Sequence, residues 1–134
     1  MTDIDRLQAL LADYVAPWVQ ALGLRVQAAQ PGEVVLTLPV TPALVHHAGI
    51  LCGQASMAAA DTAMVLAVAS DLGGFRPMTT VQLQTSFLKP ISGSEARVTA
   101  RVLRRGKSLV FGEIELAGAD GKRAVHATTT YALL

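Results

Sequence analysis

The spacing of apolar residues near the start of the chain predicts a helix. Between residues 4 and 18 apolar side chains recur every three or four positions, as in an amphipathic helix, and Thr2 or Asp3 can cap its start. Pro17 is expected to bend or interrupt this helix. Gly23 is expected to end it after Leu22.

From residue 24 to residue 40 the pattern becomes strand-like, with a turn signal at Gln30-Pro31-Gly32. This predicts a β-hairpin, which is followed by an irregular segment over residues 41–51. Further strands are predicted over residues 79–89, 96–103, 109–117 and 123–133. Because short turn signals separate these strands, we expect antiparallel neighbours.

A second helix is predicted between the hairpin and the later strands, over residues 54–70. It is rich in alanine and apolar almost all the way round, which is typical of a buried helix. Small side chains let a sheet wrap closely around it, while Met57 and Met64 fill gaps. An antiparallel sheet around one long helix is an α+β arrangement, and we expect the hotdog fold. The strand after the helix would leave an exposed sheet edge, which predicts pairing with a second copy in a homodimer.

The composition supports one compact domain over residues 1–134, because 51% of the residues are hydrophobic and only 16% are charged. A formal charge of +1 provides no field that would attract nucleic acid or an acidic membrane, and 4% aromatics provide no stacking platform for bases. Cys52 is the only cysteine, which excludes an internal disulfide and a Cys-rich zinc site. With an acidic start and no uninterrupted apolar span, the chain is expected in the cytoplasm, with no membrane partner.

Asp61 is the most informative charged residue. It is the only Asp, Glu, Lys or Arg between Glu33 and Asp71, and it falls in the middle of the alanine-rich helix. A buried carboxylate is costly unless hydrogen bonds, a partner chain or a water-filled cavity compensate. This favours a functional role for Asp61. The alternative is that Asp61 lies on an exposed part of the helix or bonds to a loop backbone.

The entry to the same helix is the second candidate. The first amides of a helix have no internal acceptor, and Gly49 and Gly53 would let a ligand carbonyl approach closely. Such an entry can stabilise negative charge on a thioester or ester oxygen, although the two glycines also suit a simple tight loop. Gly53 and Asp61 are about 12 Å apart along a helix. Two copies with antiparallel helices side by side would bring the amide of one to the carboxylate of the other.

These residues form a recognisable series: His46-x-x-Gly49-x-x-Cys52-Gly53-Gln54, followed by Asp61-x-Ala63. The series resembles the signature of hotdog acyl-CoA thioesterases of the phenylacetate-degradation type, which reads Asn-x-x-Gly-x-x-His-Gly-Gly followed by Asp-x-Ala. The later segments 86–90 and 102–109 are similar to the family's strand ending and basic turn. The resemblance covers nearly the whole chain.

The resemblance implies a role for each matching residue. Asp61 would be the nucleophile or general base on an acyl-CoA thioester, the Gly53 amide would polarise the carbonyl, and Thr80 would help hold the water. The basic turn would meet the phosphates of coenzyme A, although such a turn also suits a solvated hairpin; it comprises Arg104, Arg105, Gly106 and Lys107. No metal and no separate cofactor are implied, because coenzyme A is part of the substrate.

Three positions depart from the signature: His46, Cys52 and Gln54 stand where it has Asn, His and Gly. With Met57, we count them as substrate-binding candidates, and His46 is expected to donate or accept a hydrogen bond at the rim. Cys52 could be a nucleophile with His46 or His47 as its base, or a small buried side chain. A metal at the two histidines lacks a third ligand in the sequence, and His126 is expected to be structural.

The leading hypothesis is therefore hydrolysis of an acyl-CoA thioester to a free acid and coenzyme A. A non-catalytic acyl-CoA binding or regulatory hotdog protein is the alternative, because the motif histidine is replaced. Enoyl-CoA hydration ranks last, since only one candidate carboxylate is evident. Met57 and Met64 suggest an apolar acyl slot but leave an aromatic and an aliphatic group equally open. The carrier, coenzyme A or a protein-bound phosphopantetheine, and the pairing of dimers into tetramers also stay open.

Overall fold

A computed structural model describes residues 3–134. Its helices are α1 (Asp3–Tyr14), α2 (Pro17–Gln20), a short 3-10 turn (Pro42–Leu44) and α3 (Gly53–Leu72). Its strands are β1 (Arg25–Gln30), β2 (Glu33–Pro39), β3 (Met78–Phe87), β4 (Glu95–Arg105), β5 (Leu109–Ala117) and β6 (Arg123–Leu133). The predicted order of elements is confirmed, and the boundaries move by only a few residues.

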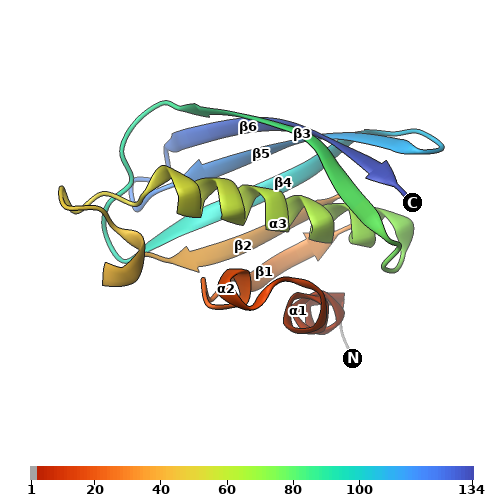
Figure 1. Ribbon diagram of the computed structural model, residues 1–134, viewed down its shortest axis with the longest axis horizontal. Coiled ribbons are helices and arrows are strands. Elements are labelled where there is room, and N and C mark those ends of the chain that lie inside the picture. The colour runs from red at the N-terminus through yellow and green to blue at the C-terminus, as the bar shows by residue number, and fades with distance from the viewer. Residues whose placement is uncertain (1–2) are drawn as a thin grey trace.

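The strands form one antiparallel sheet in the order β1-β2-β4-β5-β6-β3. Figure 1 shows α3 lying along one face of this sheet, which curves around it, while α1 and α2 lie beside β1. This is the expected hotdog fold. Strand β3 pairs with β6 alone, so it lies at an edge of the sheet, where we expected the strand after the helix.

The N-terminal helix is interrupted where Pro17 predicts. Helix α1 ends at Tyr14, and Pro17 occupies the first turn of the separate helix α2. Helix α2 ends at Gln20, earlier than expected, and Gly23 takes a left-handed conformation with φ of 76° in the turn toward β1. The proposed cap at Thr2 lies outside the described residues.

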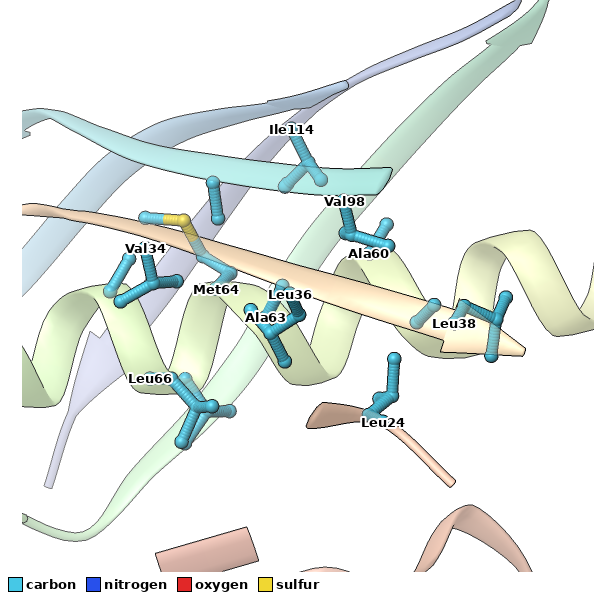
Figure 2. Close-up of a cluster of buried hydrophobic side chains, with 14 of the residues drawn as sticks. Leu24, Val34, Leu36, Leu38, Ala60, Ala63, Met64, Leu66, Val98 and Ile114 are labelled. Carbon is cyan, nitrogen blue, oxygen red and sulfur yellow. The ribbon is translucent and has the colours of Figure 1, made fainter. Parts of the chain in front are cut away.

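Helix α3 is the centre of the core. Its C-terminal half is almost wholly buried, and Figure 2 shows the Met64 side chain reaching from the helix toward Val34 and the sheet. The expectation of a buried central helix is confirmed, but one face of its first half is open. One stripe there stays uncovered; it comprises Gln54, Met57, Ala58 and Asp61, at helical spacing, of which Gln54 and Met57 are exposed and the other two half-buried. Met57, expected to fill a gap in the core, is 37% exposed.

One glycine lets the sheet approach α3 closely. A Cβ atom at Gly112 in β5 would overlap the end of the Met64 side chain and would lie 2.8 Å from the Arg101 carbonyl oxygen. Gly112 therefore makes room for Met64, whose side chain is fully buried.

Helix α3 is also long and apolar enough to cross a membrane, with a mean hydropathy of 1.3. However, 67% of the apolar window is buried within the protein, as in the core helix of a globular domain. The composition of α3 is therefore weak evidence for a membrane span.

Candidate active site

Asp61 lies in the middle of α3 and receives two hydrogen bonds at one carboxylate oxygen. Thr80 Oγ1 in β3 donates to Asp61 Oδ1 at 2.9 Å, and the Tyr131 hydroxyl in β6 donates to the same oxygen at 2.5 Å. The Tyr131 hydroxyl also lies 2.8 Å from the Asp61 backbone carbonyl oxygen. The sequence predicts that a carboxylate at this position needs compensation for its burial. These hydrogen bonds provide it, because among the described residues no cationic side chain pairs with Asp61.

The Tyr131 hydroxyl is a stable proton donor. Burial, reinforced by the neighbouring Asp61 carboxylate, raises the pKa of Tyr131 well above its ordinary value of 10.0. The hydroxyl therefore keeps its proton at neutral pH and donates it to Asp61 Oδ1. Within residues 3–134, no side chain or amide is hydrogen-bonded to the other oxygen, Asp61 Oδ2.

A cavity of about 300 Å³ lies next to this carboxylate. Asp61, Thr80 and Tyr131 contribute its polar wall, while Val19 and Val65 are among its apolar residues. The cavity combines an anchored carboxylate with apolar surface, which suits a reacting group attached to an apolar tail.

The helix entry forms a second cavity, of about 440 Å³. Gly53 is the first helical residue, and its amide has no acceptor among the residues the structure describes. The Phe87 ring lies so close that a Cβ atom at Gly53 would be 3.2 Å from it. His46 lines the same cavity and accepts a hydrogen bond from the Ala48 amide at Nδ1, 3.1 Å away. In the neutral ring the proton is therefore on Nε2.

Gly53 and Asp61 line different cavities. The structure thus joins Asp61 with Thr80, and Gly53 with His46, but it does not bring the two groups together within one chain. Eight residues of helix separate them by about 12 Å, as the spacing predicts.

Both the sequence and the fold of the chain are similar to those of known proteins. The Thioesterase superfamily matches residues 48–125, a segment that contains Gly53, Asp61 and Thr80. The chain belongs to this superfamily. A candidate esterase of Saccharolobus solfataricus is 28% identical over 113 residues, covering 84% of this chain and 80% of that protein.

Solved structures of similar fold cover almost the entire chain. A conserved protein of Pseudomonas aeruginosa has 26% identity and a TM-score of 0.82, covering 90% of this chain and 95% of that one. The E. coli PaaI protein, from the phenylacetic acid degradation operon, has 20% identity and a TM-score of 0.86, covering 98% and 93%. At 20% identity the second likeness concerns the fold alone.

Cys52 directly precedes α3 in this thioesterase-superfamily chain, at the position where the signature has a histidine. Its side chain is half-buried against the core and does not cap the helix. Within the described part of the chain it makes no hydrogen bond to His46 or His47. The geometry therefore offers no base for a Cys52 nucleophile. Gln54, the next departure, is exposed on the open stripe of α3.

The basic turn lies at the other end of α3. Arg105 Nε is 2.6 Å from Oδ2 of Asp71, in the last turn of the helix, so one of the predicted phosphate ligands is already paired. Arg104 and Lys107 are exposed and form no ion pair with residues 3–134. Figure 1 shows the light-blue β4–β5 hairpin at the end of the molecule where α3 finishes. Within one chain the turn is therefore far from Gly53.

Two other features of the chain lie away from the site. His126, on the outer face of the sheet, pairs with Glu113 at 3.2 Å, in keeping with a structural role. No group of three His, Cys, Asp or Glu residues in the described chain is arranged to hold a metal. Another cavity, of about 560 Å³, lies between α1, the β1–β2 turn and Phe75. Its charged side chains include the paired Asp3 and Arg6, and it lacks a histidine or cysteine.

Sequence reasoning did not identify two residues that the fold places at the site. Tyr131 is 70 residues from Asp61, so no local motif connects them. Phe87 was noted only as part of a strand ending, yet its ring lies on Gly53. The alternation of β6 makes Tyr131 one of its buried positions, but nothing in the sequence pairs it with Asp61.

Proposed function

We propose that the protein hydrolyses an acyl-CoA thioester to a free acid and coenzyme A, with Asp61 of one subunit and the Gly53 amide of its neighbour. Membership of the thioesterase superfamily supports thioester hydrolysis in general. The observation that carries the specific proposal is the Asp61 carboxylate, which is held at Oδ1 by two donors and lines a cavity with both polar and apolar walls.

The proposed chemistry uses Asp61 Oδ2, the carboxylate oxygen that receives no hydrogen bond from the described residues. In one route Asp61 Oδ2 attacks the thioester carbonyl carbon, the C–S bond breaks, and water then hydrolyses the mixed anhydride. In the other route Asp61 accepts a proton from a water molecule that attacks the same carbon directly. Both routes consume one water and release one acid and one thiol. In both, the Gly53 amide would stabilise the negative charge that develops on the carbonyl oxygen.

A dimer would bring the Gly53 cavity of one subunit next to the Asp61 cavity of the other. The open stripe of α3 offers a partially apolar surface for a second α3, and β3 offers an unpaired edge. Met57 lies four residues from both Gly53 and Asp61. A two-fold axis beside Met57 would therefore place Gly53 of each copy next to Asp61 of the other, giving two sites per dimer. Further pairing of dimers into tetramers is compatible with this arrangement.

Each part of the substrate has its own proposed binding region. The acyl group would occupy the cavity beside Asp61, where Val19 and Val65 provide apolar contacts. Arg104 and Lys107, both free of ion pairs with described residues, are the candidates for the coenzyme A phosphates. The phenylacetate-degradation subtype rests on the signature residues and would make the acyl group aromatic. The cytoplasmic location stays a prediction from the sequence.

Binding without turnover is the second candidate function. It is favoured by one observation, Cys52 in place of the motif histidine, because a thiol is a weaker hydrogen-bond donor than an imidazole. A protein of this kind would retain both cavities and bind acyl-CoA tightly without releasing thiol.

Release of free thiol from a panel of aromatic and aliphatic acyl-CoAs tests the proposal. The wild type should turn over at least one class, and Asp61→Asn should lower kcat by about 100-fold or more, because an amide is neither a base nor a nucleophile. Asp13→Asn, an exposed change of the same kind on α1, is the matched control. Tight acyl-CoA binding without thiol release by the wild type would support the binding function instead. Full activity of Asp61→Asn would refute the assigned role of Asp61.

A further inference from the structure

Tyr131 and Thr80 form one rung of the sheet. They are register partners in the β3–β6 pair, and both hydroxyls donate to the same oxygen of Asp61. The β3 register shifts immediately after Thr80, between Thr80 and Gln82. Bulges of this kind re-aim side chains and are common beside active sites.

The two donors differ in how firmly the fold holds them. Thr80 is exposed on the edge strand β3. Tyr131 is 1% exposed on β6, which is hydrogen-bonded to β5 on one side and β3 on the other. The Tyr131 hydroxyl also contacts the Asp61 backbone carbonyl oxygen, so it is held against both the backbone and the carboxylate of Asp61.

We infer that Tyr131 is a positioning residue for the reaction: its hydroxyl holds Asp61 Oδ1 against the sheet and thereby aims Oδ2 at the substrate cavity. A carboxylate can rotate about its Cβ–Cγ bond and exchange its two oxygens. Two donors on one oxygen, one of them inside the core, stop this exchange and preorganise the other oxygen for attack or for proton transfer.

This inference rests on the proposed role of Asp61 and predicts a specific kinetic signature for Tyr131→Phe. Because a hydrogen bond to a charged group is lost, kcat should fall by about 10- to 100-fold. KM should change little, because Tyr131 does not bind the coenzyme A portion.

Thr129→Val is the matched control. Thr129 lies two residues earlier on the same face of β6, is 4% exposed and donates from Oγ1 to the Gln82 carbonyl oxygen at 2.7 Å. The control therefore removes a buried hydroxyl from the same strand without touching Asp61. It should keep the wild-type kcat and KM even if its thermal stability falls.

The experiment compares kcat and KM of wild type, Tyr131→Phe and Thr129→Val in the full chain. A second variant, 3-fluorotyrosine at position 131, retains the hydroxyl donor, so it covers the case in which Tyr131→Phe does not fold. Its kcat should stay within about threefold of the wild-type value, because the hydrogen bond to Asp61 is kept. A folded Tyr131→Phe with the wild-type kcat, an equal loss of kcat in Thr129→Val, or a loss of kcat of about 10-fold or more in the 3-fluorotyrosine variant would overturn the positioning role. If Asp61→Asn is fully active, the proposed function itself has failed, which is a distinct result.

Discussion

Thr80 Oγ1 and Asp61 Oδ1 are 2.9 Å apart, which ties the edge strand β3 to the middle of the central helix. The bond uses the hydroxyl proton of Thr80, so any water that Thr80 holds must donate to its remaining lone pairs. Such a water would lie beside the carboxylate, as a general-base route requires. The bond also holds the start of β3 beside Asp61, and the end of β3 places Phe87 against Gly53.

The Gly53 amide can be tested without breaking the helix. Gly53 is the first helical residue, and Cys52 before it has φ of −69° and ψ of 149°, which is compatible with a following proline. Gly53→Pro removes the N–H, whereas Gly53→Ala keeps it and adds a similar clash with Phe87. We expect kcat to fall by about 100-fold in Gly53→Pro and by much less in Gly53→Ala. Steady-state kinetics, with circular dichroism to check folding, measures this; equal losses in the two variants would point to the clash rather than the amide.

Cys52 should be dispensable for catalysis. The thiol has no basic partner at hydrogen-bond distance among the described residues, so Cys52→Ala is expected to retain kcat within about threefold. The same thiol-release assay measures this. A loss comparable with that of Asp61→Asn would instead identify Cys52 as a participant in the reaction.

Much of the fold could be predicted from local pattern. The alternation of residues 109–117 and the turn signals on either side predict a strand, whichever strand it pairs with. The alanine-rich segment predicts a helix that is buried against the face of a sheet. The open stripe of α3 could not be predicted, because hydropathy does not separate Met57, which is exposed, from Met64, which is buried. That difference depends on where the sheet ends.

The site was predictable only where a residue type carries its own signal. Asp61 is an isolated charge in an apolar helix, and Gly53 begins that helix, so both could be identified from the sequence. The Tyr131–Asp61 bond spans 70 residues and depends on the register of β6 against β3. The pairing of Arg105 with Asp71 likewise depends on the tertiary position of the β4–β5 hairpin.

Gly112→Ala should destabilise the protein through overpacking. The added methyl group would overlap Met64 and crowd the Arg101 carbonyl oxygen, at an expected cost of about 1–3 kcal/mol in the free energy of unfolding. Gly74→Ala is the control, because a Cβ atom there meets nothing within 4 Å and its φ is not positive. Urea denaturation of both variants measures the difference. A Gly112→Ala variant as stable as Gly74→Ala would show that Met64 and the sheet can shift at little cost.

Tyr131 should contribute a pH dependence to stability under alkaline conditions. Burial first, and the Asp61 carboxylate next, raise the pKa of Tyr131 above 10.0 in the folded state. The folded state therefore retains a proton that the unfolded state loses, so this contribution is complete below about pH 10 and declines as the pH rises further. The urea midpoint of the wild type should fall more steeply than that of Tyr131→Phe between about pH 9 and about pH 11. Parallel curves would contradict a raised pKa.

The sharing of one site between two subunits is the central claim, and a mixed dimer tests it most directly. Asp61→Asn and Gly53→Pro are each expected to be inactive, and the two chains can be co-expressed with different tags so that the heterodimer is purified. If each site combines Asp61 of one chain with Gly53 of the other, the heterodimer contains one intact site and should recover about half of the wild-type activity. A folded heterodimer as inactive as both parents would contradict the shared site.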